Sequence, residues 1–251
     1  MPMDIFHGIY FGRGSPTELR FSKDVLKSFQ REVDIVSQLN HPNVVKFIER
    51  LKNPPSLVLE FCPSSLARII RSGGLGPEKA AEIIVQIADA IMKIHEKGYV
   101  HGDIKPENIL FSNDRIPKLS DFNTMKALTT VSKSNPVFTP GYAAPEQLHG
   151  YKLTPTTDSW SLALVLYETI TGRPLLPKDG DEYQETIARL ERREAITFES
   201  TGVEEIDEII RNCLQVEPEG RMSMRDIRDR LLKYLYNSLK GIQNNQERKW
   251  T

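Results

Sequence analysis

The feature that most constrains this chain is a short polar run, His-Gly-Asp-Ile-Lys-Pro-Glu-Asn, at residues 101–108. Two further motifs follow it in order. Asp-Phe-Asn begins at Asp121, 13 residues after Asn108, and Ala-Pro-Glu ends at Glu146, 25 residues after Asp121. A lone Asp-Phe pair would carry no information. Three motifs in this order and at this spacing are too specific to arise by chance, and they limit the folds that the chain can adopt.

Hydrophobic periodicity around these motifs predicts a few strands followed by many helices, an α+β arrangement. An amphipathic helix is expected over residues 24–39, with Glu32 at the inner edge of its apolar face. Strands are expected at 44–48 and 57–61, and short segments and loops at 99–157. Further helices are expected at about 77–97, from 158 onward, at 203–215 and at 223–239.

The bulk composition excludes several classes of protein. The formal net charge of the 251 residues is −1, which gives no electrostatic reason to expect a nucleic-acid or membrane partner. Cys62 and Cys213 are too few for a disulfide framework or a zinc site. The first residues lack the basic flank and apolar core of a secretory signal, and no apolar run approaches ~20 residues. We therefore expect a soluble, cytoplasmic protein.

In order and spacing, the three motifs resemble those of the protein kinase superfamily. The family signatures are H-R-D-x-x-x-x-N, D-F-G and A-P-E, and this chain carries H-G-D-I-K-P-E-N, D-F-N and A-P-E. The resemblance is strong over residues 25–235 and poor over 1–23. It implies a protein kinase fold with a reduced, β-rich small lobe and a mainly α-helical large lobe. The expected division is 1–61 for the truncated small lobe, 62–240 for the large lobe and 241–251 for a polar tail.

The resemblance implies a catalytic role for each of five residues. Phosphoryl transfer needs positioning and charge neutralisation more than covalent chemistry. Asp103 would accept or orient the proton of the attacking hydroxyl, and Lys105 would steady the transferred phosphoryl group. Asn108 and Asp121 would hold Mg²⁺ against the ATP phosphates. Thr139 would bridge to the catalytic aspartate, as in the serine/threonine branch. Taken alone, Asp103 would more often be a helix or turn cap, Asn108 a turn residue and Asp121 an ordinary surface carboxylate, so the register of the set carries the assignment.

The segment at residues 56–62 resembles the last strand of the small lobe and the hinge that follows it. Leu59 would be the gatekeeper, and the backbone of Glu60 and Cys62 would hydrogen-bond adenine. Leu110 completes the expected nucleotide-binding residues of the large lobe. A plain buried strand explains the same residues, and only the position between the first helix and the catalytic loop favours the hinge.

Other matches to the family are architectural. Asp158 would hold the backbone of the catalytic loop, and Arg221 would pair with Glu146. The hydrophobic spine of the family would be formed by Val36, Phe47, His101 and Phe122.

The chain departs from the family mostly near its N-terminus. Glu32 matches the helix glutamate, but the strand lysine that should pair with it is not evident. Arg20 falls in the lysine's place, and Lys23 is a rival with little room before the helix. The glycine-rich phosphate loop is not reproduced, and Gly12 and Gly14 fit a hairpin turn better. Arginine keeps the positive charge, but its planar fork differs from a compact ammonium group.

Two departures lie within the motifs themselves. Asn123 replaces the glycine after Asp121-Phe122, and asparagine tolerates unusual backbone angles better than most residues. Gly102 replaces the arginine before Asp103, so the chain is of the non-RD type. In kinases with that arginine, a phosphorylated activation loop pairs with it. We therefore expect any activity to survive replacement of the activation-segment hydroxyls, which are Thr129, Thr130, Ser132 and Ser134.

Three functions compete. The first is a serine/threonine protein kinase that uses ATP and Mg²⁺ on a protein substrate. The alternative is an inactive or weakly active kinase-like module that binds a regulatory protein partner, which the missing glycine loop and lysine favour. The third, a small-molecule kinase, is disfavoured because residues 139–142 and 144–146 resemble a platform for peptide substrates.

Overall fold

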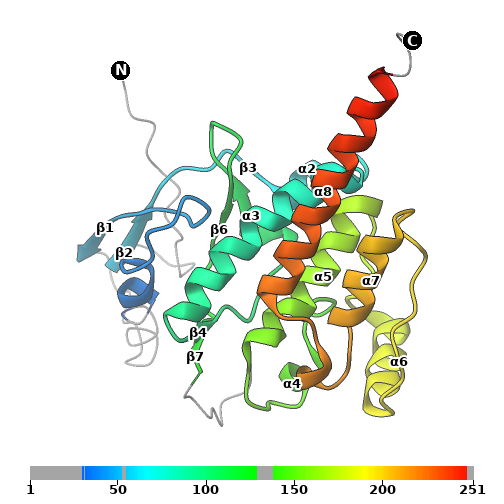
Figure 1. The fold of residues 1–251 in the computed structure, drawn as a ribbon. Coiled ribbons are helices and arrows are strands. Elements are labelled where there is room, and N and C mark those ends of the chain that lie inside the picture. The colour runs from blue at the N-terminus through cyan, green and yellow to red at the C-terminus, as the bar shows by residue number, and fades with distance from the viewer. Residues whose placement is uncertain (1–29, 31, 53–54, 129–137, 248–251) are drawn as a thin grey trace.

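The computed structural model describes residues 30, 32–52, 55–128 and 138–247 (Figure 1). The glycine hairpin, Arg20 and Lys23 lie outside this part of the chain. So do the four activation-segment hydroxyls named above. Within the described part no helix is long and apolar enough to cross a membrane.

The first described elements are a short helix and a two-stranded antiparallel sheet. Residues 32–36 are helical, and Val36 is fully buried. Strand β1 (Phe47–Lys52) pairs with β2 (Pro55–Leu59).

The predicted strand at 44–48 was misplaced. Val44 forms an isolated parallel bridge with Leu119, far along the chain: Val45 N donates to Leu119 O (2.9 Å) and Leu119 N donates to Asn43 O (2.8 Å). Because those two residues pair elsewhere, the hairpin strand begins only at Phe47. The same contact ties the first sheet to the helical part of the protein.

Three long helices form the body of the protein, namely α3 (Pro77–Glu96), α5 (Pro155–Thr171) and α8 (Met224–Glu247). Figure 1 shows α8 lying across α3, with its last turns projecting beyond the neighbouring helices. The helix predicted at 77–97 is confirmed, and its four isoleucines at helical spacing, Ile84, Ile87, Ile91 and Ile94, are all fully buried. It ends before Gly98, which takes φ +81°.

Helix α5 is buried over nearly its whole length. Thr154 caps its N-terminus together with Thr157, and Gly172 ends it in the left-handed conformation at φ +72°. Because α5 lies within the core, its polar residues need partners inside the protein. Two of them, Asp158 and Glu168, make such contacts with the segments described below.

Shorter elements surround these helices. The helices are α2 (Leu66–Ile70), α4 (Pro145–Leu148), α6 (Gly180–Glu191) and α7 (Glu204–Cys213), with 3₁₀ turns η1 (Pro106–Asn108) and η2 (Pro218–Gly220). The strands are β3 (Ser64–Ser65), β4 (Tyr99–Val100), β5 (Ile109–Phe111), β6 (Pro117–Leu119) and β7 (Lys126–Ala127). One sheet has the order β3-β5-β6, and β4 pairs with β7. The α+β class and the helical large lobe are thereby confirmed.

Candidate active site

Two antiparallel strand pairs bring the first two motifs together. β4 precedes residues 101–108 and β5 follows them, while β6 precedes residues 120–125 and β7 follows them. Because β4 pairs with β7 and β5 with β6, the two loops lie side by side. The hydroxyl and the N–H of Ser120 both donate to Asn108 O, each at 2.9 Å. The sheets therefore set the register of the site.

Asp158 of α5 fixes the start of the catalytic loop. It accepts from the N–H groups of His101 (3.0 Å) and Gly102 (2.9 Å), and its Oδ2 lies 2.7 Å from His95 Nε2. Burial alone would raise the pKa of Asp158, but the bonds and charges from the two histidines and the Gly102 N–H outweigh it and lower the pKa. The loop is thus held by a buried, ionised carboxylate.

The carboxylate of Asp103 lies at the centre of a hydrogen-bonded cluster. Lys105 Nζ donates to Asp103 Oδ2 and to Thr139 Oγ1, both at 2.6 Å. Thr139 Oγ1 donates in turn to Asp103 Oδ1 at 2.6 Å. Asn108 Nδ2 donates to Asp103 O (2.8 Å) and Oδ2 (3.2 Å). The structure therefore brings four of the five catalytic candidates together, and Asp103 is only 6% exposed.

Asp121, the fifth candidate, has an unusual backbone and an unused oxygen. Its φ is +64°, in the left-handed region that few residues other than glycine adopt. Asn123, which stands where the family has glycine, is not among the described residues with positive φ. Asp121 Oδ1 is buried and has no hydrogen-bond partner in the described part of the chain. Such an oxygen is a suitable ligand for a hard cation.

The donor set fits Mg²⁺. Asp121 offers this orphaned oxygen, and Asn108, whose amide nitrogen is engaged by Asp103, can offer its amide oxygen. The described residues contain no group of three or more His, Cys, Asp or Glu side chains that could hold a metal by themselves. Magnesium commonly takes one or two protein ligands together with substrate phosphates and water, so a sparse set is adequate.

Glu32 lies close to the same site. It is 8% exposed, and burial, together with the negative charge of Asp121, raises its pKa to about 7. Its expected partners Arg20 and Lys23 lie outside the described residues. Burial and the charge of a second acid thus both favour the protonated form of Glu32.

The hinge candidates adjoin the first sheet. Glu60 N donates to Lys46 O at 2.9 Å, so the N–H of Glu60 is already engaged within the protein. The Glu60 side chain accepts from Lys118 Nζ at 2.8 Å. Burial and the charge of Glu60 raise the pKa of the Cys62 thiol to about 11. Leu110 lies in β5, half-buried, between Ser65 and Lys118.

The spine candidates lie in one core. His101 packs edge-to-face on Phe122, with ring centroids 5.9 Å apart. Val36 and Phe122 are buried in the main hydrophobic cluster, and Phe47 packs against it. This packing supports the two loops that carry the first two motifs.

Two polar residues at the site were not anticipated from the sequence. Thr124 Oγ1 donates to His101 O (3.1 Å), and Gln147 Nε2 donates to Gly102 O (2.8 Å). Their only signal is adjacency to the second and third motifs, which does not distinguish them from other polar neighbours.

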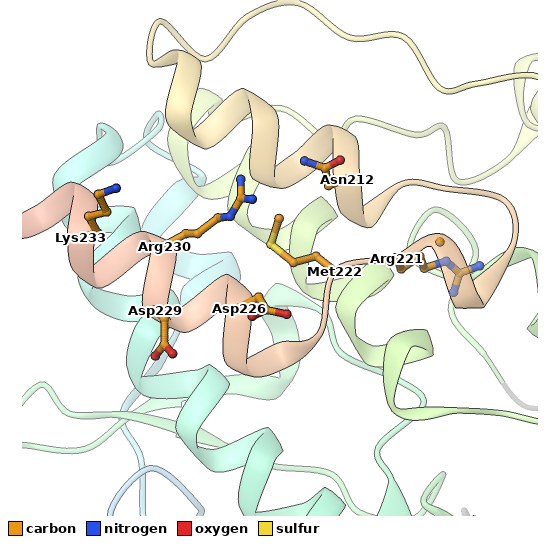
Figure 2. A pocket seen from close by; sticks show the side chains of 8 residues that line it. Asn212, Arg221, Met222, Asp226, Asp229, Arg230 and Lys233 are labelled. Carbon is orange, nitrogen blue, oxygen red and sulfur yellow. The ribbon is translucent and has the colours of Figure 1, made fainter.

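A cavity of about 430 Å³ lies elsewhere, between α7 and α8. Figure 2 shows its lining, which carries charges of both signs; the side chains include Asn212, Asp226, Asp229, Arg230 and Lys233. None of the catalytic candidates lines it. We therefore assign the candidate site to the Asp103 cluster.

Comparison with known proteins gives a family match over most of the chain. The sequence model of the family described as "Protein kinase domain" matches residues 17–232. The chain is 33% identical to human calcium/calmodulin-dependent protein kinase type IV over 183 residues, which cover 68% of this chain and 39% of that protein.

Two further relatives cover more of the chain. Serine/threonine-protein kinase ATG1a of Arabidopsis thaliana is 30% identical over 82% of this chain and 34% of its own length. Cytokinesis protein sepH of Aspergillus niger is 30% identical over 82% of this chain and 16% of its own length. The chain thus spans well under half of each of these relatives.

Proposed function

Because the chain belongs to the protein kinase family, we propose that it transfers the γ-phosphate of ATP to serine or threonine hydroxyls of a protein substrate. The observation that carries this proposal is the closed set of hydrogen bonds among Asp103, Lys105 and Thr139. Such a set holds a buried carboxylate in one orientation, as positioning of an attacking hydroxyl requires.

In the proposed mechanism, Asp103 accepts or orients the proton of the substrate hydroxyl. Its Oδ1 accepts from Thr139 and its Oδ2 from Lys105, so the side chain cannot rotate freely. Lys105 Nζ, 2.6 Å from Asp103, also places a positive charge beside the base. This charge would offset the repulsion between the Asp103 carboxylate and the negative transferred phosphoryl group.

Mg²⁺ would neutralise charge on the ATP phosphates and align them. Asn108 and Asp121 would hold it, through the amide oxygen of Asn108 and the unpartnered Oδ1 of Asp121. The carbonyl of Glu60 and the N–H of Cys62 would orient adenine. Gly102 leaves no arginine for a phosphorylated activation segment to bind, so we propose that activity is independent of that switch.

The test is transfer of labelled phosphate from ATP to a serine- or threonine-containing protein, with and without Mg²⁺. Asp103→Asn should lower the rate at least ~100-fold, because general-base assistance is typically worth that much. Asp114→Asn is the matched control, since Asp114 is exposed in the turn after β5. Unchanged transfer by a folded Asp103→Asn protein would refute the proposal.

The second candidate is a binding module without turnover. It is favoured by one observation: burial, together with the negative charge of nearby Asp121, raises the pKa of Glu32 to about 7, whereas a paired cation would lower it. If no cation from residues 1–29 joins them, the phosphate anchor is missing. Thermal denaturation with and without Mg-ATP separates the candidates, since a ligand that binds the folded state raises the midpoint. No shift and no transfer would favour the module.

A further inference from the structure

The peptide group that joins Gly102 to Asp103 is held from outside the catalytic loop. Gly102 O accepts from Gln147 Nε2 at 2.8 Å, and Gly102 N donates to Asp158 Oδ1 at 2.9 Å. Gly102 has φ +77°, a conformation that other residues rarely adopt. The residue just before the proposed base is therefore fixed on both sides.

Gln147 is itself fixed. Its side chain is buried, with the residue 2% exposed, and its Oε1 accepts from Ala144 N at 3.0 Å. It lies in α4, next to Glu146, which is paired with Arg221. Both polar atoms of the Gln147 amide thus form hydrogen bonds, Oε1 within the end of the activation segment and Nε2 to the catalytic loop.

We propose that Gln147 is a positioning residue, which orients Asp103 by holding the Gly102–Asp103 peptide against α4. Among the described residues Gln147 is the donor to Gly102 O, and a buried carbonyl that loses its donor favours any shift of its peptide that restores a hydrogen bond; Asp103 shares that peptide plane. The amide acts without phosphorylation and without an arginine at position 102. This inference rests on the proposed kinase activity for its kinetic consequence, but the hold on the peptide is independent of it.

Two variants separate the two bonds of Gln147. Gln147→Met keeps the length of the side chain and removes both bonds. Gln147→Glu keeps the acceptor for Ala144 N–H and loses the donor to Gly102 O. Gln86→Met is the matched control, because Gln86 also uses both amide atoms, accepting from Asn43 (3.2 Å) and donating to Glu82 O (3.0 Å), away from the catalytic loop.

The kinetic measurement is the split between kcat and KM. Both Gln147 variants should lower kcat about tenfold, while KM for ATP and for the protein substrate stays within about twofold. Gln86→Met should leave both constants unchanged. A folded Gln147→Glu protein with the wild-type kcat would overturn the proposal, and so would an equal loss in Gln86→Met.

Hydrogen exchange of the amides of Gly102 and Asp103 gives a readout that needs no turnover. It should become about tenfold faster in both Gln147 variants and stay unchanged in Gln86→Met. If the wild type transfers no phosphate and exchange still rises only at these amides, the positioning role stands and the kinase proposal fails. If the wild type is active and exchange is unchanged, or rises evenly over the whole chain, the positioning role fails. Should Gln147→Met not fold, Gln147→Glu carries the comparison.

Discussion

Arg221 and Glu146 meet through two parallel hydrogen bonds, Nη1 to Oε1 and Nη2 to Oε2, each 2.7 Å long. Both residues are buried, and the guanidinium also lies 5.1 Å from the ring of Trp160. The remaining donors of Arg221 reach backbone carbonyls, which are those of Thr156, Gln215 and Val216. This pair anchors α4, and therefore the end of the activation segment, to the loop before α8.

Removal of one partner would leave a buried charge without compensation. We expect Arg221→Ala and Glu146→Ala each to lower the free energy of unfolding by ~3–5 kcal/mol, measured by chemical denaturation. Arg211→Ala is the comparison, because the Arg211–Glu204 pair is exposed and should be worth only ~0–1 kcal/mol. Equal stability of all three variants and the wild type would show that the buried pair contributes nothing.

Because of Asp158, we expect the free energy of unfolding to depend on pH in the acid range. Its pKa is lower in the folded chain than the ordinary 3.8, so its charge stabilises the fold above that pH, and the contribution is lost as the pH falls through the folded value. Asp158→Asn should cost ~1–3 kcal/mol at pH 7, because two buried N–H groups lose a charged acceptor. The stability difference from the wild type should shrink as the pH falls below about 4. A difference that grows on acidification would contradict this account.

The sequence predicts the body of this fold because local periodicity and tertiary burial agree there. In α3, isoleucines at helical spacing are the same residues that the core buries. The cluster around Asp103 is also foreseeable, since three of its members lie within residues 103–108 and the resemblance to the serine/threonine branch of the kinases adds Thr139. The sequence could supply the members of the site. Their hydrogen bonds depend on how the paired strands bring the loops together.

Other features depend on partners that no local pattern reveals. Val45 satisfies its N–H on Leu119, so the strand predicted at 44–48 starts three residues late. Helix α6 falls within the general expectation of helices from residue 158 onward, but its bounds were not predicted, because Leu190 is the one residue of it that is buried and no long apolar stripe marks it. Helix α8 continues to Glu247, past the predicted end at 239, through residues too polar to mark a buried helix. No sequence pattern indicates the role of Gln147 either, since that role depends on a carbonyl of another loop.

Tyr142 and Glu168 form a buried hydrogen-bonded pair, and the stability lost when this bond is removed should depend on pH. The Tyr142 hydroxyl donates to Glu168 Oε2, and both residues are buried. Burial raises the pKa of Glu168, and the bond from Tyr142 and the charge of Lys178 partly oppose this rise. In Tyr142→Phe the pKa of Glu168 should therefore rise further.

An acid with a raised pKa destabilises the folded state as the pH rises. We expect Tyr142→Phe to lose ~1–3 kcal/mol of unfolding free energy at pH 8 and less at pH 5, measured by denaturation at both values. Tyr151→Phe is the control, because Tyr151 is 68% exposed and should show no loss at either pH. A loss that is the same at both pH values would mean that Glu168 is not involved.

The pH dependence of stability at Glu32 tests whether a cation pairs with this residue. With a pKa of about 7 in the folded chain against the ordinary 4.5, it favours folding fully below pH 4.5, and this contribution is lost as the pH rises from 4.5 to 7. The wild type should therefore become less stable than Glu32→Gln across this interval, by up to ~3 kcal/mol. The measurement is the difference in unfolding free energy between the two proteins at a series of pH values. A cation supplied by Arg20 or Lys23 would reverse the sign, because it would lower the pKa of Glu32 and make the wild type the more stable protein at pH 7.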